Sequence, residues 1–150
     1  QQRVGKDGVV FEILKYRTMV KNAESDGAVF TAANDSRVTA FGKFMRKTRM
    51  DEFPQFINIL KGDMAVIGPR PERPIFVKEI AEIMPFYETR HIIKPGLTGW
   101  AQVNYSYGET IDDSLIKLQY DLYYIKHRSI YLDMNIAFKT ITTILFYRGQ

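Results

Sequence analysis

Hydrophobic and polar positions in the first half of the chain follow two different spacings. The run at residues 9–19 predicts a strand, or a hairpin arm entered through the turn at residues 5–8. Residues 38–46 carry apolar side chains at helical spacing, and a second helix begins near Asp51 and ends at Gly62. One face of this second helix is apolar and consists of Phe53, Phe56, Ile57 and Leu60.

The second half is mostly helical in pattern. We expect helices at about residues 72–84, 112–126 and 131–147, and a turn at 94–99 that leads into a short segment at 100–104. Residues 20–36 are polar and predict a short helix followed by a loop that closes over substrate. The chain is therefore predicted to be one helix-rich domain, residues 1–150, of an irregular α/β or α+β class with a few short strands.

Composition narrows the chemistry. The chain is 45% hydrophobic, which suffices for a core, and its net charge of +4 suits phosphates, lipid head groups, nucleic acid or simply a soluble surface. The absence of cysteine excludes disulfides and thiolate metal sites, and the only histidines, His91 and His127, lie far apart. Any metal would be held by carboxylates, which favours Mg²⁺.

Membrane signals are indirect. No apolar run is long enough to span a bilayer, and we see no signal peptide. The chain begins without methionine, so we expect it to be part of a longer protein. The last predicted helix is apolar on more than one face and carries basic residues, which suits either a helix at a membrane interface or an ordinary core helix.

The strongest candidate for chemistry is the adjacent pair Asp51 and Glu52, which follows Arg46 and Arg49. The arginines and a helix N-terminus favour ionised carboxylates, and an ionised aspartate can attack phosphorus. The alternative is that Thr48 and Asp51 only cap the helix, and the pattern alone favours this alternative.

Three cationic residues are candidate phosphate ligands. Arg70 stands between two prolines, which preset its backbone, and the preceding helix could return it to the neighbourhood of Asp51. Lys15 and Arg17 would share one face of the first predicted strand. A surface salt bridge for Arg70 and a solvated strand face for Lys15 and Arg17 remain the structural alternatives.

Two further groups are less specific. Trp100, Gln102 and Asn104 could read a base or sugar, although a core role is commoner for a tryptophan. Asp121 and Asp133 lie among apolar and aromatic residues, where each could belong to a site or pair with a lysine or arginine.

Taken together, these stretches resemble the bacterial sugar transferases, the monotopic phosphoglycosyl transferases. The resemblance rests on the order and spacing of several segments across nearly the whole chain. These are Arg3-Val4-Gly5, residues 11–19, Met50-Asp51-Glu52 with Pro54-Gln55, Lys61-Gly62-Asp63-Met64, residues 68–71, residues 94–104, and Tyr120-Asp121 with Tyr123-Tyr124.

The resemblance implies a two-step reaction at the cytoplasmic face of the bacterial inner membrane. The residue matching Asp51 is the nucleophile that takes a sugar phosphate from a nucleotide sugar, expected to be a UDP-sugar, and passes it to polyprenyl phosphate. Glu52 would complete the catalytic pair and help to bind Mg²⁺. The resemblance further implies phosphate contacts from Lys15, Arg46 and Arg70 and places Asp121 in or beside the site, as a further substrate-binding candidate. Arg17, Lys94, Gln102 and Asn104 are the other substrate-binding candidates of the chain.

The chain looks closer to the long members that initiate exopolysaccharide assembly, which carry N-terminal membrane segments. Small members run Gly-Arg-Asn after the residue matching Asn104, whereas this chain runs Tyr105-Ser106-Tyr107-Gly108. The runner-up function is a non-catalytic basic module that binds lipid phosphates or nucleic acid, but it does not explain Asp51 and Glu52. If the chain is an enzyme of this kind, we expect nucleotide sugar, polyprenyl phosphate and inner-membrane lipid as partners, and no nucleic acid. A second copy of the chain is a further candidate partner.

Overall fold

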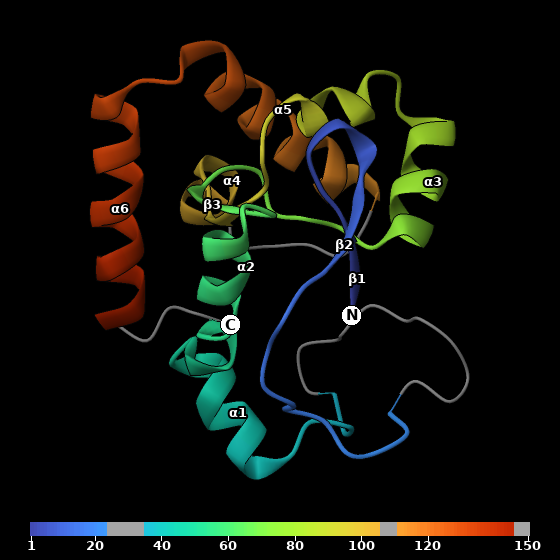
Figure 1. Ribbon diagram of the computed structural model, residues 1–150, viewed down its shortest axis with the longest axis vertical. Helices are drawn as coiled ribbons and strands as arrows, with labels where there is room; N and C mark the ends of the chain where they lie inside the picture. Colours follow the sequence, from blue (N-terminus) through green and yellow to red (C-terminus); the bar gives the residue numbers. More distant parts are fainter. Residues whose placement is uncertain (24–34, 106–110, 146–150) are drawn as a thin grey trace.

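The computed structural model describes residues 1–23, 35–105 and 111–145, the side chains of Ile111, Asp112, Ile144 and Leu145 excepted. It confirms a helix-rich domain with a few short strands (Figure 1). In chain order its elements are β1 (Gln2–Val4), η1 (Lys6–Gly8), β2 (Val10–Glu12), α1 (Ala40–Lys47), η2 (Met50–Glu52), α2 (Gln55–Lys61), β3 (Ala65–Ile67), α3 (Pro74–Ile83), η3 (Tyr87–Ile92), β4 (Gly96–Thr98), α4 (Trp100–Asn104), α5 (Ile111–His127) and α6 (Ile130–Leu145).

Two small sheets organise the described residues. Strands β1 and β2 form an antiparallel hairpin around η1, as the turn at residues 5–8 predicts. Strands β3 and β4 are parallel, so the chain must cross over between them, and it does so through α3 and η3. In Figure 1, α6 and α3 lie at opposite sides, α5 runs across the top, and α1 and α2 extend below.

The hydrophobic core formed by the described residues has two parts. One joins β1, α3, η3 and α5 and contains Val4, Phe76, Val77, Ile80, Met84, Tyr87 and Leu118. The other joins α5 and α6 through Tyr124, Leu132 and Ile136, with Ile67 and Trp100 packed against it. The predicted core role of Trp100 is therefore confirmed in part, since its side chain is half-buried rather than enclosed.

The first predicted strand is wrong beyond Glu12. Ile13 still bonds to Gln1 beside the hairpin, and Met19 forms an isolated antiparallel bridge with Val38, but the residues between them belong to no sheet. The Ile13 N–H donates to Gln1 O, the Leu14 N–H to Asn58 Oδ1 and the Tyr16 N–H to Asp51 O. Lys15 and Arg17 therefore do not share the face of a strand.

Helix α2 turns its apolar side to solvent and buries polar side chains on the opposite side. The predicted apolar face is present, but Phe53, Phe56, Ile57 and Leu60 are exposed. Gln55 and Asn58, the polar residues on the other face, are only 2% and 1% exposed. The helix ends at Gly62, whose positive φ of 87° is the left-handed turn that the sequence predicts there.

The described helices include none that is long and apolar enough to cross a bilayer. Most of the predicted loop at residues 20–36 lies outside the described residues. The same holds for most of Tyr105-Ser106-Tyr107-Gly108, the segment that differs from the small family members.

Candidate functional site

Asp51 and Glu52 lie in a tight 3₁₀ turn between α1 and α2. Arg49 adopts a left-handed conformation with φ of 58°, which ends the first helix and turns the chain toward η2. The two carboxylates are buried, at 8% and 9% exposure. The capping alternative fails for Thr48, whose hydroxyl donates back to Phe44 O and Met45 O, and the start of η2 has no side-chain cap.

Glu52 is held by two arginines. Arg70 Nη2 donates to Glu52 Oε1 at 2.6 Å, and Arg49 Nη1 lies 3.6 Å from the same oxygen. Burial by itself raises the pKa of Glu52, but Arg70 and Arg49 outweigh it and hold the pKa below its usual value. The prediction that α2 returns Arg70 to the acidic pair is confirmed, with Glu52 rather than Asp51 as its partner.

Asp51 is in a different electrostatic state. Its pKa is raised, first by burial and then by the neighbouring Glu52, while Lys15 and Arg46 oppose the shift. The two adjacent carboxylates therefore have pKa values pushed in opposite directions. Such a separation is a property of sites that use one carboxylate for chemistry and the other for support.

Lys15 faces both carboxylates. The pKa of Lys15 is lowered to about 8, first by burial of its ammonium and then by Arg3 and Arg70, while Asp51 and Glu52 oppose the shift. By accessible surface, however, Lys15 as a whole residue is exposed. A cation with a lowered pKa beside a carboxylate pair suits contact with an anionic ligand.

Asn58 holds the segment that carries Lys15, and sequence reasoning missed it. Its side chain accepts from the Leu14 N–H at 2.9 Å and donates to Glu12 O at 2.7 Å and to Asp63 Oδ2 at 3.2 Å. A side-chain amide can both donate and accept, so it can satisfy the backbone N–H and C=O groups of an extended segment that pairs with no strand. The available signal was Asn58 itself, an asparagine inside an apolar helix.

Arg46 is placed by the packing of α1. Its Nε donates to the hydroxyl of the buried Thr18 at 2.8 Å. Gly42 allows this approach, because a Cβ there would lie 2.0 Å from Thr18 O. Thr39 caps α1 by accepting from the Gly42 N–H.

Asp121 is paired with Arg90 rather than with the carboxylate pair. It is 2% exposed, and its Oδ2 is 2.7 Å from Arg90 Nη2. Arg90 Nη2 also donates to the backbone oxygen of Arg70 at 2.8 Å. Asp133 accepts from the Tyr124 hydroxyl at 2.7 Å, so its partner is a tyrosine.

The other predicted site residues are not joined to the acidic pair by any hydrogen bond or ion pair found in the described part of the chain. Gln102 Nε2 donates to Leu97 O, and Asn104 bonds to Trp100 O and Lys139 Nζ. Arg17 is exposed, and Lys94 lies next to Gly62 at the end of α2.

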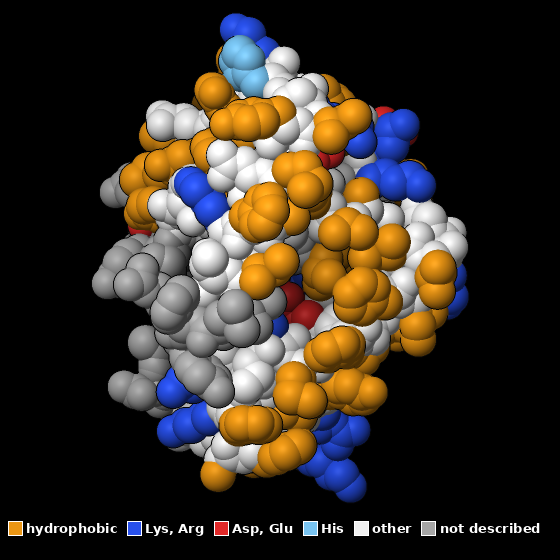
Figure 2. Space-filling view, turned by 90° about the vertical axis from the view of Figure 1, so that its left-hand side faces the viewer, with side chains coloured by type: hydrophobic (Ala, Val, Ile, Leu, Met, Phe, Trp, Pro, Cys, Tyr) orange, Lys and Arg blue, Asp and Glu red, His pale blue; other side chains and the backbone are white. Residues whose placement is uncertain are grey.

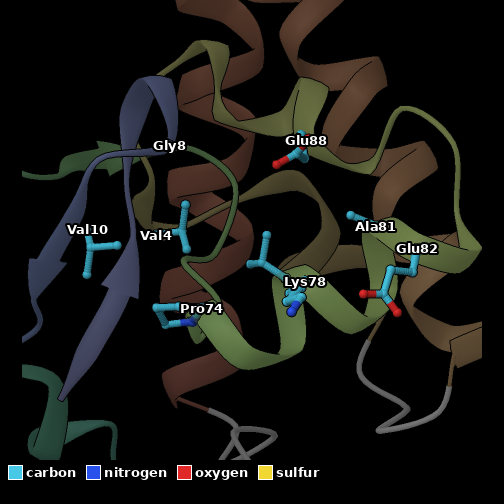
Figure 3. Close-up of a pocket in the computed structure, with 9 residues that line it drawn as sticks. Val4, Gly8, Val10, Pro74, Lys78, Ala81, Glu82 and Glu88 are labelled. Carbon is cyan, nitrogen blue, oxygen red and sulfur yellow. The ribbon is translucent and has the colours of Figure 1, made fainter.

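A pocket of about 460 Å³ lies elsewhere, between the β1–β2 hairpin and α3 (Figure 3). Val4, Val10, Pro74 and Val77 contribute apolar walls, and Lys78, Glu82 and Glu88 are also among its lining residues. None of the predicted site residues lines it. Asp51 and Glu52 do not line this pocket either. We therefore keep the acidic pair, rather than the pocket, as the candidate site for chemistry.

Comparison with known sequences decides the family. The family model described as bacterial sugar transferase matches residues 1–147. The chain belongs to the bacterial sugar transferase family.

Named relatives of this family member include a UDP-N-acetylgalactosamine-undecaprenyl-phosphate N-acetylgalactosaminephosphotransferase of Aeromonas hydrophila, 53% identical over 97% of this chain and 34% of the relative. A UDP-glucose:undecaprenyl-phosphate glucose-1-phosphate transferase of Escherichia coli (strain K12) is 43% identical over 94% of this chain and 31% of the relative. The uncharacterized sugar transferase EpsL of Bacillus subtilis (strain 168) is 35% identical over 99% of this chain and 70% of the relative. The chain thus spans about a third of the first two relatives.

The donor set of this sugar transferase domain suits a hard cation. The described residues contain no group of three or more histidine, aspartate or glutamate side chains that could hold a metal. Mg²⁺ does not need such a cage, since it is commonly held by one or two carboxylates, waters and substrate phosphates. Asp51 and Glu52 are two adjacent buried carboxylates and could provide this.

The surface around the site is strongly apolar. Figure 2 shows hydrophobic side chains over much of the face where α6 lies, with acidic side chains at the bottom of a hollow between them. Exposed hydrophobic residues of α1, η2, α2 and the turn between them are Phe41, Phe44, Met50, Phe53, Phe56, Ile57 and Leu60. Those of α6 are Ile130, Tyr131, Met134, Phe138 and Ile141. Apolar exposure of this extent marks an interaction surface.

Proposed function

We propose that this domain transfers a sugar phosphate from a UDP-sugar to polyprenyl phosphate through a covalent intermediate on Asp51. One observation carries the proposal: a buried aspartate-glutamate pair lies among Lys15, Arg46, Arg49 and Arg70. Named relatives act on undecaprenyl phosphate and UDP-sugars, which supports the same substrates here.

In the first step, a carboxylate oxygen of Asp51 attacks the β-phosphorus of the UDP-sugar. The bond from this phosphorus to the bridging oxygen breaks, and UMP leaves with the electron pair. Asp51 then carries the sugar phosphate as an acyl phosphate. Lys15 and Arg46, which face Asp51, offset the charge of the phosphates as they approach.

In the second step, a phosphate oxygen of polyprenyl phosphate attacks the same phosphorus. The bond to Asp51 breaks, and the carboxylate is restored. The product is a polyprenyl diphosphate sugar, so no water or redox partner is consumed. Arg70 and Arg49 keep Glu52 ionised throughout, because they hold its pKa below the usual value.

Mg²⁺ fits this chemistry as a group held by Asp51 and Glu52 together with the phosphates of the donor. When bound, it neutralises charge on the phosphate oxygens. The chain's own residues orient the nucleophile and surround it with cations.

The apolar faces of α1, α2 and α6 support a location at the lipid surface. A lipid acceptor must bring its phosphate to Asp51 while its chain stays in the bilayer. Side chains such as Leu60, at 88% exposure, could enter the interface beside the site. We propose that the domain lies at the cytoplasmic face of the inner membrane, because nucleotide sugars are made in the cytoplasm.

The test is UMP release by the full-length protein in detergent with Mg²⁺, undecaprenyl phosphate, and UDP-N-acetylgalactosamine or UDP-glucose. We expect release that needs the lipid for turnover and that falls at least a thousandfold in Asp51→Asn. Absence of release from folded protein with both donors would instead support the binding-module alternative.

A further inference from the structure

Arg90 and Asp121 form a buried ion pair that the reaction itself does not use. Their exposures are 6% and 2%, and burying two charges is costly unless geometry compensates for the lost hydration. Burial alone lowers the pKa of Arg90, but Asp121 raises it above the usual value. A pair retained at this cost calls for a structural purpose.

The contacts of Arg90 lead directly to the site. Its Nη1 donates to the Tyr87 hydroxyl at 2.6 Å, and its Nη2 donates to Arg70 O at 2.8 Å. The side chain of the same Arg70 donates to Glu52 at 2.6 Å. Asp121 on α5 and Glu52 on η2 are thereby connected through two arginines.

The backbone of the turn makes this connection stiff. Prolines 69 and 71 restrict the backbone dihedrals on both sides of Arg70. Gly96 N–H donates to Pro69 O at 2.9 Å, which ties the turn to β4. Arg90 bonds to the next carbonyl along the chain, that of Arg70.

We infer that Arg90 is a positioning residue for the sugar phosphate transfer: held by Asp121 and Tyr87, it fixes the Arg70 carbonyl and so aims Arg70 at Glu52. This inference rests on the proposed function for its kinetic meaning. Lysine cannot replace Arg90, because one ammonium cannot reproduce two donors in one plane, directed at the Tyr87 hydroxyl and the Arg70 carbonyl, with the charge beside Asp121.

A double-mutant cycle in the full-length protein tests the inference. We expect Arg90→Lys to lower kcat/KM for the UDP-sugar by about tenfold or more, since small displacements in an active site have effects of this order. In the Arg70→Lys background the same change should alter kcat/KM less than about twofold, because the residue it acts through is gone. Arg128→Lys, an exposed arginine on the loop before α6, is the matched control and should leave activity unchanged.

If Arg90→Lys does not fold, Asp121→Asn, which keeps the side-chain shape, replaces it in the same double-mutant cycle with Arg70→Lys. Equal losses in both backgrounds, or wild-type kcat/KM in both folded variants, would overturn the inference. Hydrogen exchange provides a readout independent of turnover. Asp121→Asn should speed exchange at Glu52 and Gly68 before other amides, whereas uniform acceleration across the domain would indicate a merely structural pair.

If the wild-type protein releases no UMP, the proposed function fails while the exchange measurement still decides whether Arg90 positions the turn. In that case, faster exchange confined to Glu52 and Gly68 would still show that Arg90 positions the turn, although the reaction would not be the one proposed.

Discussion

Lys15 should give the reaction an alkaline limit close to neutrality. Its pKa is lowered to about 8 by burial and by Arg3 and Arg70, against the opposing pull of Asp51 and Glu52. If the charged ammonium binds donor phosphates, its deprotonation removes that contact. Replacement by arginine, which stays charged, is the informative perturbation.

The size of the effect follows from the pKa. With a value of about 8, Lys15 is about 90% charged at pH 7 and about 10% charged at pH 9. We therefore expect kcat/KM to fall about tenfold per pH unit above pH 8. A lysine at its ordinary value of 10.5 would show no such fall in this range. On the acid side, the raised pKa of Asp51 should place the other limit above the usual 3.8.

The assay is UMP release by the full-length protein between pH 5 and 10 at fixed Mg²⁺ and ionic strength, read as kcat/KM for the UDP-sugar. Lys15→Arg should remove the alkaline fall, and Lys43→Arg, an exposed lysine on α1, should retain it. An alkaline limit that is identical in Lys15→Arg would refute the assignment of this limit to Lys15.

Two further outcomes test the fold and the surface around the site. Asn58→Leu should lower the free energy of unfolding in urea by about 3 kcal/mol, because it leaves Leu14 N–H and Glu12 O without their buried partner; a loss below about 1 kcal/mol would contradict this role. Leu60→Asp should weaken binding of the chain to anionic vesicles about tenfold or more without lowering Tm, since burying one leucine is worth about 1.5–3 kcal/mol. Ile83→Asp, an exposed apolar residue on α3, is the control, and an equal loss there would argue against a specific membrane face.

The sequence was informative where local rules decide the outcome. Gly62 ends α2 and the turn at residues 5–8 closes a hairpin, because both depend on backbone preferences of nearby residues. The Asp51–Glu52 pair and Arg70 could be selected from charge and turn chemistry, and the structure brings Arg70 to Glu52.

Long-range partners could not be read in the same way. The segment after β2 has strand composition, but it bonds to Asn58 and Asp51, which are distant in sequence. Periodicity finds the apolar face of α2 but does not say which side meets the core, and here Gln55 and Asn58 are buried instead. The sequence points to Asp121 as a site residue, whereas its buried partner Arg90 can be found only from the tertiary structure.

The central claim is that Asp51 carries the sugar phosphate, and mass spectrometry of the digested protein tests it most directly. The full-length protein is incubated with Mg²⁺ and UDP-N-acetylgalactosamine or UDP-glucose without lipid acceptor, then quenched and digested. The account predicts UMP release of no more than one equivalent and a mass increase of one sugar phosphate on the peptide that contains Asp51, absent in Asp51→Asn and discharged by undecaprenyl phosphate. UMP release by Asp51→Asn equal to that of the wild type, or an adduct on another residue, would contradict it.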